Sequence, residues 1–423
     1  MNNIPARRFK KLYEQILLSH ILFFMIGWLL TVLLPAVIYW NIDVLFRPSP
    51  GQYIGLFAST TAYWGTNFSL KHWLMPFPGG RSAGLVITQV FTIYLTVFFI
   101  TLFLRVEASR ALLLMSAVLA MLFFLFELRV SQIYYRSKLA VLPKGFALNL
   151  VGLSAVDVRL LSVLDLGGVR YDGVVADFGV LNAKEERFLT SCALQGVPVY
   201  NAKQIYESIT GRVKIDRMSE NSIGALLPSP IFERVKQCVE TALVLSVAPF
   251  CILIGLVTAL LIRLESPGPV IYSQLRIGKG NRPFRIYKFR SMRFDLDAPP
   301  QFAGENDPRI TRIGRIIRKL RIDELPQFFN VLKGDMSLIG PRPEQPVFVE
   351  EFDRKIPFYS YRHVVKPGIT GWAQVRHGYA ADADTTQTKI EYDFFYIKHC
   401  SFRMDFYIVL LTLRTMLTGF GAR

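Results

Sequence analysis

The chain has 423 residues, of which 52% are hydrophobic and 19% are charged, with a formal charge of +17 and a mean hydropathy of +0.32. This combination excludes a disordered chain, because disorder requires low hydrophobicity alongside charge. Positive mean hydropathy over so many residues indicates long apolar runs that a soluble core does not require. The four cysteines lie far apart, with no paired spacing and no close histidine, so neither a disulfide framework nor a zinc site is predicted. We expect a basic membrane protein with several domains.

The N-terminal third contains apolar runs long enough to cross a bilayer. Residues 16–40 are almost free of charge and follow a basic cluster at 7–11. This run is too long for a signal-peptide core and lacks a cleavage pattern, so we predict a retained helix. Residues 85–104 and 111–128 are joined by a short charged link and predict a helical hairpin. Residues 52–70 carry several Thr, Ser and Asn side chains, so they are either a weaker span or an extracytoplasmic loop.

Basic residues decide the predicted topology of these helices. They precede the first run and reappear after the last one, at Arg129, Arg136, Lys138 and Lys144. The positive-inside rule places both clusters in the cytoplasm, so the number of crossings must be even. Four helices satisfy this condition, with Lys71 and Arg81 also inside. We therefore predict about four transmembrane helices over residues 1–138, which serve as an anchor without chemistry.

Residues 139–230 return to a soluble composition. They contain three short apolar runs, at 146–153, 173–177 and 197–200, with helix-like stretches between them. Strands that alternate with helices predict a small parallel α/β domain of Rossmann-like type. A dinucleotide site would need a glycine-rich turn after the first strand, and residues 151–157 supply a single glycine. Dinucleotide binding is therefore not favoured.

The third predicted domain, residues 231–423, contains an uncharged run of 22 residues at 241–262 near its start. That length can span a bilayer. Pro249 lies inside the run and removes one helical hydrogen bond, so a kinked helix that enters and leaves on one face is an equal alternative. A crossing helix would place the second and third domains on opposite sides of the membrane, whereas a re-entrant helix keeps both in the cytoplasm.

The segment from Arg276 to Arg293 contains seven cations and no carboxylate. A run of one sign destabilises itself unless it faces anions, and phosphates are the natural candidates. We do not expect nucleic acid to supply them, because the sequence shows no recognisable nucleic-acid-binding module. A phosphorylated substrate and lipid headgroups are the better alternatives. A solvated basic loop at the membrane surface also fits these residues when they are taken alone.

Five arginines then recur every three residues from Arg309 to Arg321, with isoleucines between them. Read as a helix, the arginines occupy one side and the isoleucines another, which is typical of an amphipathic helix that lies flat on an anionic bilayer. A guanidinium also binds a phosphate through a bidentate fork, so some of these arginines can serve a substrate instead.

Asp323 and Glu324 follow the arginine repeat directly. With Pro326 in the first turn and Gly334 just past the end, the pattern predicts a short helix capped by Asp323, and capping alone would explain the residue. Catalysis is the alternative. Adjacent carboxylates at a helix start point in different directions, and the amino end of a helix stabilises both a carboxylate and an approaching phosphate. Such a pair could also hold Mg²⁺ against an anionic substrate.

Seven motifs occur in order through this region of the chain. They are Ser-Pro-Gly-Pro-Val-Ile-Tyr-Ser-Gln at 266–274, Arg-Ile-Gly at 276–278, Pro-Phe-Arg-Ile-Tyr-Lys-Phe-Arg-Ser-Met at 283–292, Asp-Pro-Arg-Ile-Thr-Arg-Ile-Gly at 307–314, Asp-Glu-Leu-Pro-Gln at 323–327, Gly-Asp-Met-Ser-Leu-Ile-Gly-Pro-Arg-Pro at 334–343 and Val-Lys-Pro-Gly-Ile-Thr-Gly-Trp-Ala-Gln at 365–374. Together they resemble the bacterial polyprenyl-phosphate hexose-1-phosphate transferases that start exopolysaccharide, capsule and O-antigen repeat units. The likeness covers residues 233–423, and the layout before them is similar to the long form of the family.

The resemblance implies transfer of a hexose-1-phosphate from a UDP-sugar to undecaprenyl phosphate, with release of UMP. Asp323 would be the nucleophile that forms a phosphosugar-aspartyl intermediate, which the lipid phosphate resolves. Glu324 and Mg²⁺ would steady the diphosphate and the departing UMP, with both carboxylates as metal ligands. The basic residues that match the family's motif positions, and would bind phosphates, are Lys288, Arg290, Arg318 and Arg342.

The resemblance also bears on the membrane. Family members use a re-entrant helix before the catalytic region, which favours that alternative for residues 241–262. Two departures are Ala248-Pro249 in place of the usual Ser-Pro break and Glu240 in place of an aspartate. We expect the bacterial inner membrane, a catalytic domain in the cytoplasm, contact with an anionic bilayer, and a second interfacial helix at 406–416.

Several alternatives stay open at this point. Glucose, galactose and N-acetylated sugars fit the motifs equally. A homodimer could form through the N-terminal helices and the middle domain. The alternative function is a catalytically silent assembly or regulatory protein of the polysaccharide machinery.

Overall fold

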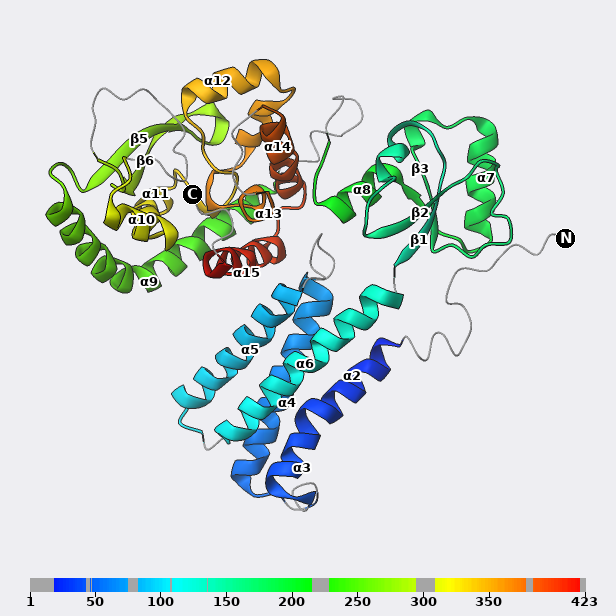
Figure 1. The fold of residues 1–423 in the computed structure, drawn as a ribbon, viewed down its shortest axis with the longest axis horizontal. Helices are drawn as coiled ribbons and strands as arrows, with labels where there is room; N and C mark the ends of the chain where they lie inside the picture. The colour runs from blue at the N-terminus through cyan, green and yellow to red at the C-terminus, as the bar shows by residue number, and fades with distance from the viewer. Residues whose placement is uncertain are drawn as a thin grey trace. The chain divides into compact units, whose positions relative to one another are not determined.

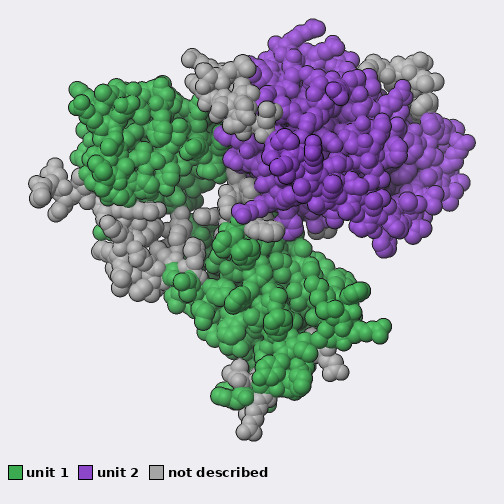
Figure 2. Space-filling model, turned by 180° about the vertical axis from the view of Figure 1, so that it is seen from behind, with its two compact units in different colours: residues 1–211 green, residues 212–423 purple. Residues whose placement is uncertain are grey.

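The computed structural model describes residues 19–42, 46, 48–74, 83–106, 109–134, 136–214, 228–293, 309–377 and 383–418 (Figure 1). The basic cluster at 7–11, Arg81 and the first two residues of the 307–314 motif lie outside these ranges. The contacts within the chain divide it into two compact units, residues 1–211 and 212–423 (Figure 2). The predicted domain limits at residues 138 and 230 stay predictions.

The described residues of unit 1 begin with four helices. The first consists of α2 (His20–Trp28), a π-helical turn (Leu29–Leu33) and α3 (Leu34–Trp40), and the others are α4 (Pro50–Phe68) with a π-helical extension (Ser69–Leu74), α5 (Ala83–Phe103) and α6 (Arg110–Tyr134). Three stretches of unit 1 are long and apolar enough to cross a membrane: Ile21–Trp40, Ala83–Phe103 and Arg110–Gln132. The prediction of apolar helices before residue 138 is therefore confirmed.

Residues 52–70 are helical rather than an irregular loop, and their crossing of the membrane stays a prediction. Tyr63 on α4 is fully buried, and its ring stacks on that of Phe124 on α6 with centroids 5.5 Å apart. Lys71, just past α4, forms an ion pair with Glu127 on α6 at 3.2 Å. The carboxyl ends of the second and fourth helices therefore lie together, as expected for consecutive helices that alternate in direction.

The middle of the chain forms a four-stranded parallel sheet with strand order β2-β1-β3-β4. Its strands are β1 (Ser137–Val141), β2 (Val156–Leu160), β3 (Gly173–Ala176) and β4 (Val199–Asn201), and its helices are two 3₁₀ turns (Gly145–Leu150 and Phe178–Val180), α7 (Ala183–Leu194) and α8 (Ala202–Thr210). Separate apolar clusters cover the two faces of the sheet. The predicted parallel α/β fold is confirmed.

One predicted strand is wrong, and two strands, β1 and β2, were missed. The apolar run at 146–153 lies mainly in the 3₁₀ turn Gly145–Leu150, which buries Phe146 and Leu150 against the sheet. A short apolar run does not distinguish a strand from a buried helical turn. The first strand is instead Ser137–Val141, in which full burial begins only at its third residue.

Unit 2 contains α9 and a mixed α/β arrangement with two small sheets. In chain order its elements are α9 (Pro230–Glu265), the antiparallel hairpin β5 (Ile271–Ile277) and β6 (Pro283–Phe289), α10 (Arg312–Lys319), a 3₁₀ turn (Ile322–Glu324), α11 (Gln327–Lys333), β7 (Ser337–Ile339), α12 (Pro346–Lys355), a 3₁₀ turn (Tyr359–Val364), β8 (Gly368–Thr370), α13 (Trp372–Arg376), α14 (Ala383–Lys398) and α15 (Phe402–Thr418). Strands β7 and β8 pair in parallel. The predicted helix at 406–416 lies within α15, which buries Met404 and Tyr407 inside the unit.

α9 packs on the rest of unit 2 on both sides of Pro249. Val244 joins a core cluster with side chains of β6 and α11, and Ile262 joins another with Phe289 and Ile317. Between these contacts the helix is largely exposed, with Phe250 at 70%. Figure 1 shows that α9 bends along its length, as expected with Pro249 inside it.

α9 also begins earlier than residue 241, because charged residues of its first turns are buried with partners. Lys236 donates hydrogen bonds to Ile339 O at 2.9 Å and to Tyr396 Oη at 2.6 Å, and it forms an ion pair with Asp405 at 2.9 Å. Glu240, the departure from the family pattern, accepts a hydrogen bond from the Ser337 hydroxyl at 2.6 Å. A run of uncharged residues alone therefore underestimates the length of the helix.

The arginine repeat forms a shorter helix than predicted. α10 spans eight residues, and the side chain of Thr311 caps it by accepting a hydrogen bond from Gly314 N at 2.9 Å. Arg321, just beyond its end, has a left-handed φ of 55°. Ile317 faces the core, whereas Ile316 is 55% exposed. The helix therefore presents one apolar side chain inward and another outward.

Candidate active site

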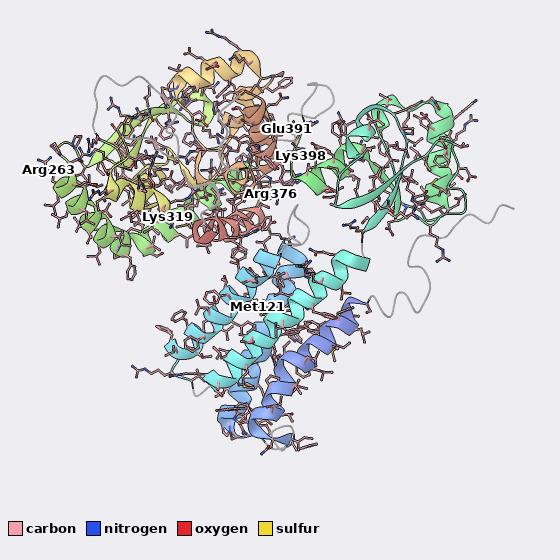
Figure 3. The ribbon with its side chains drawn as sticks, in the orientation of Figure 1. Met121, Arg263, Lys319, Arg376, Glu391 and Lys398 are labelled. Atoms are coloured by element: carbon pink, nitrogen blue, oxygen red, sulfur yellow. The ribbon has the colours of Figure 1, made fainter. Side chains whose placement is uncertain are left out.

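The acidic pair lies in the 3₁₀ turn Ile322–Glu324, between α10 and α11 (Figure 3, where Lys319 marks the end of α10). Asp323 is 9% exposed and Glu324 7%. The predicted cap is wrong, because α11 starts at Gln327 and its N-cap position is Pro326, while Asp323 is inside the preceding turn. The predicted end of the helix is confirmed, since Gly334 adopts the left-handed conformation with φ 86°.

Cations from three parts of unit 2 surround Glu324. Its Oε1 accepts hydrogen bonds from Lys288 Nζ of β6 at 3.2 Å and from Arg342 Nη1 at 3.1 Å. Its Oε2 lies 3.7 Å from Arg321 Nη1. Burial by itself would raise the pKa of Glu324, but the charges of these cations outweigh it and hold the pKa below the usual range. Glu324 is therefore a carboxylate at neutral pH.

Asp323 has a different environment from its neighbour. Burial, followed by the negative charge of Glu324, raises the pKa of Asp323, while Lys288, Arg318 and Arg342 act in the opposite direction. No residue in the described ranges donates a hydrogen bond to its carboxylate. The oxygens of Asp323 are therefore available to a ligand or a reaction partner.

Two buried atoms at the site lack hydrogen-bond partners within the described part of the chain. They are Nη1 of Arg318 and Oε2 of Glu324. A buried donor or acceptor without a partner costs free energy in the unliganded protein. An unpaired guanidinium nitrogen fits a phosphate oxygen, and an unpaired carboxylate oxygen fits a cation.

The acidic pair fits Mg²⁺ as one part of its ligand set. In the described ranges no group of three or more His, Cys, Asp or Glu side chains could hold a metal ion by itself. Mg²⁺ is commonly held by one or two carboxylates together with substrate phosphates and water. Asp323 and Glu324 would then provide the protein ligands, and a diphosphate would provide the others.

Arg290 is placed away from the acidic pair. Its guanidinium donates to Pro267 O at 2.6 Å and to Ser266 O at 2.7 Å, beyond the carboxyl end of α9. The side chain is buried and holds the chain between α9 and β5. The structure thus gives Arg290 a role in the fold, and its contact with a phosphate stays a prediction. The other three predicted cations all act on Asp323.

Close packing positions α10, which carries Arg318. A Cβ atom on Gly314 would lie 1.9 Å from Ser291 O, so only glycine allows the helix to approach the chain after β6 this closely. Asn330 on α11 fixes β6 on its other side, by accepting from Tyr287 N at 3.2 Å and donating to Arg285 O at 2.7 Å. Neither Asn330 nor Arg321 was predicted as a site residue. For Arg321, its spacing of three residues from Glu324 was the sequence feature that could have indicated their contact.

Comparison with known proteins identifies the family. The family model described as "Bacterial sugar transferase" matches residues 231–419. The chain is 49% identical over 420 residues to the UDP-N-acetylgalactosamine-undecaprenyl-phosphate N-acetylgalactosaminephosphotransferase of Aeromonas hydrophila, and the match covers 99% of both chains. The protein belongs to the bacterial sugar transferase family. The resemblance seen in the motifs, and the prediction of a transferase, are confirmed.

Two further relatives match a smaller share of this chain. The UDP-glucose:undecaprenyl-phosphate glucose-1-phosphate transferase of Escherichia coli is 45% identical over 159 residues, which are 37% of this chain and 34% of that protein. The enzyme of the same name from Caulobacter vibrioides is 43% identical over 190 residues, 44% of this chain and 70% of its own. Transferases named for different sugars are therefore similar to parts of this sequence.

Proposed function

We propose that the protein transfers a hexose-1-phosphate from a UDP-sugar to undecaprenyl phosphate through a covalent phosphosugar intermediate on Asp323, with release of UMP. The observation that carries the proposal is the contrast within the acidic pair. Glu324 is engaged by Lys288 and Arg342, whereas the buried carboxylate of Asp323 receives no hydrogen bond from the described residues. The product would begin a repeat unit of exopolysaccharide, capsule or O-antigen.

The proposed reaction consists of two displacements at one phosphorus atom. First, a carboxylate oxygen of Asp323 attacks the phosphorus that carries the sugar, and the bond from that phosphorus to the bridging oxygen breaks. UMP leaves with the electron pair of this bond, and a carboxyl-phosphate anhydride remains on Asp323. A phosphate oxygen of undecaprenyl phosphate then attacks the same phosphorus, the anhydride bond breaks, and Asp323 is again a free carboxylate.

The surrounding residues hold the reacting groups. Lys288 and Arg342 keep Glu324 ionised and oriented through its Oε1 atom, while the unpaired Nη1 of Arg318 binds a phosphate oxygen of the donor. Mg²⁺, when bound by the acidic pair, would supply electrostatic stabilisation of the departing UMP. Burial of the acidic pair limits access of water to the anhydride on Asp323.

We propose N-acetylgalactosamine as the sugar. The relative named for UDP-N-acetylgalactosamine matches over 99% of both chains, whereas the Escherichia coli and Caulobacter transferases named for glucose match 37% and 44% of this chain. A panel of UDP-sugars tests this choice. N-acetylgalactosamine should give the highest kcat/KM, and a preference for UDP-glucose would overturn it.

We further propose that α9 is re-entrant in the bacterial inner membrane. A straight helix of 36 residues would be about 54 Å long, well beyond a bilayer core of about 30 Å. α9 is instead bent, and Val244 before Pro249 and Ile262 after it pack on the same unit, which supports a helix that enters and leaves on one side of the membrane. The exposed apolar stretch around Phe250 would enter the bilayer, with Ile316 of α10 at the interface. The positive-inside rule places the catalytic unit in the cytoplasm.

An isotope-exchange experiment tests the covalent intermediate. Membranes that contain the protein, depleted of undecaprenyl phosphate, are incubated with UDP-N-acetylgalactosamine, Mg²⁺ and radiolabelled UMP. An intermediate on Asp323 returns label to the UDP-sugar without any acceptor. Asp323→Asn should lower both this exchange and the complete transfer by at least about 10⁴-fold, because the nucleophile is lost. Glu351→Gln, the same change on an exposed helical carboxylate, serves as the matched control and should keep full activity.

Two results would contradict parts of the proposal. Exchange that requires undecaprenyl phosphate would indicate a direct transfer without the intermediate. Absence of UMP release from every UDP-sugar, by protein that is folded and membrane-bound, would favour the alternative function of a catalytically silent assembly protein.

A further inference from the structure

Helix α14 presents two charged side chains of opposite sign, Lys389 and Asp393, one helical turn apart (Figure 3, where Glu391 and Lys398 mark the helix). Residues four apart lie on the same face of a helix. Neither residue touches the acidic pair. Both are connected instead to the loop after β7, which carries Arg342.

Asp393 is connected to Arg342 through Arg362. Its Oδ2 accepts hydrogen bonds from Arg362 Nε at 3.1 Å and Nη2 at 2.7 Å, and the same Nη2 donates to the backbone carbonyl of Arg342 at 2.9 Å. Tyr359 Oη accepts from Arg362 Nη1 at 3.1 Å. Arg362 is 2% exposed and Asp393 1%, so this geometry is held without competition from water.

Lys389 fixes the same loop two residues further along. Its Nζ donates to Glu344 Oε1 at 2.6 Å, and Arg276 Nη1 lies 3.5 Å from the other carboxylate oxygen. The backbone carbonyl of Glu344 accepts a hydrogen bond from Ile277 N at 3.0 Å. Hydrogen bonds to Arg342 and Glu344 therefore hold the loop on both sides of Pro343.

These hydrogen bonds to the loop bear on the position of Arg342, because its side chain is 37% exposed. A long side chain with that exposure is not fixed by packing and has much rotational freedom to lose. The position of its backbone then determines how often its guanidinium lies on Glu324, at the observed 3.1 Å. A displacement of about 1 Å in a supporting group is enough to reduce catalysis substantially.

We propose that Arg362 and Asp393 are positioning residues for the transfer reaction, because they hold the carbonyl of Arg342 and thereby keep its guanidinium on Glu324. The inference rests on the proposed function for the role of Glu324. A buried ion pair adds little stability compared with packed apolar side chains. The planar guanidinium fork, however, bonds Asp393, Tyr359 and the Arg342 carbonyl together, which apolar side chains cannot do.

A double-mutant cycle on the full chain in membranes tests the inference. The four proteins are wild type, Arg342→Gln, Arg362→Lys and the double variant. Arg362→Lys keeps the charge and removes the fork. We expect Arg342→Gln to lower kcat/KM for the UDP-sugar by about 100-fold and Arg362→Lys by about 10-fold. The double variant should match Arg342→Gln within about twofold, because the second change acts through a side chain that is already absent.

The matched control is Phe395→Leu, a change on α14 that loosens the stacking of its ring on Trp372 and leaves the loop alone. In the double variant of Phe395→Leu and Arg342→Gln, the two fold-losses in kcat/KM should multiply. If the losses of Arg362→Lys and Arg342→Gln also multiply, Arg362 is merely structural and the inference is overturned.

The cycle stays informative if Arg362→Lys shows no cooperative thermal unfolding. Lys389→Gln, which loosens Glu344, then replaces it in the same cycle. If kcat/KM of the new double variant matches that of Arg342→Gln, the result supports a loop that is held in place. If the two losses in kcat/KM multiply, the inference is overturned. Failure of the proposed function would appear elsewhere, as UMP exchange that Asp323→Asn leaves intact.

Discussion

The middle α/β domain and unit 2 each place an aspartate at a 3₁₀ turn, and the two side chains have opposite surroundings. Asp177 follows β3, and its carboxylate accepts hydrogen bonds from Phe146 N at 2.8 Å and from Gly179 N at 3.2 Å. A Cβ on Gly145 would lie 2.3 Å from the same carboxylate, so the chain approaches it as closely as glycine allows. Asp323 is buried among cations and receives no such bond from the described residues.

The comparison separates a carboxylate that is bonded to backbone amides from one that is open to a ligand. The backbone amide of Phe146 lies at the start of the turn after β1, where doubly wound folds commonly bind the phosphate of a cofactor. Asp177 fills this position with the protein's own anion, which agrees with the absence of a glycine-rich fingerprint. Asp323 lies among cations and accepts no hydrogen bond from the described residues, so its carboxylate oxygens stay open to a ligand from outside the chain.

Removal of divalent metal should give the largest effect that distinguishes the two aspartates. Glu324 Oε2 is buried and accepts no hydrogen bond from the described residues, so it is open to coordinate a metal cation. Excess EDTA should lower UMP release by at least about 10³-fold, and added Mg²⁺ should restore it. Hydrogen exchange at the Phe146 amide, bonded to Asp177, should be the same with and without EDTA. Full transferase activity in EDTA would show that the acidic pair works without a metal.

Loss of Lys288 should have the next largest effect. Burial lowers the pKa of this ammonium, and the charge of Glu324 offsets part of that effect. Lys288→Met keeps the length of the side chain, removes the 3.2 Å bond to Glu324 and leaves two carboxylates with less positive charge. We expect kcat/KM to fall by about 100-fold, or about 2.7 kcal/mol in transition-state stabilisation.

The control for Lys288→Met is the same substitution at Lys355, an exposed residue that pairs with Glu351. Its effect on stability should lie within about 0.5 kcal/mol, and its activity should be unchanged. Equal kinetics for the two variants would contradict the assignment of Lys288 to the acidic pair.

The sequence predicted the architecture where one physical rule acts alone. Hydropathy and length located the apolar helices, and the alternation of strands and helices located the parallel sheet. Prediction from the sequence failed where two signals compete. The apolar run at 146–153 buries its side chains through a 3₁₀ turn. The strand β1 was not predicted because the charged residue Lys138 lies at its start, although its later residues are fully buried.

For the site, the motifs located the acidic pair but not the contacts around it. Lys288 comes from β6, Arg318 from α10 and Arg342 from the loop after β7, and their convergence on Asp323 is a tertiary property. Arg290 stands two residues from Lys288 in the same basic run, yet it binds backbone carbonyls beyond α9. A count of cations cannot separate these two roles, because both need a guanidinium or an ammonium near oxygen atoms.

The smallest functional effect should come from Asp177→Ala. This change leaves the amides of Phe146 and Gly179 without their acceptor. The Gly179 amide is exposed and can bond to water, whereas Phe146 is buried and an unsatisfied buried amide costs about 1–3 kcal/mol. Hydrogen exchange followed by mass spectrometry on the full chain should show faster exchange in peptides that cover the turn after β1. UMP release should be within about twofold of wild type, because Asp177 belongs to unit 1 and to no part of the proposed site. A loss of activity near that of Asp323→Asn would mean that the middle domain contributes to the chemistry, and the separation between a structural and a reactive aspartate would fail.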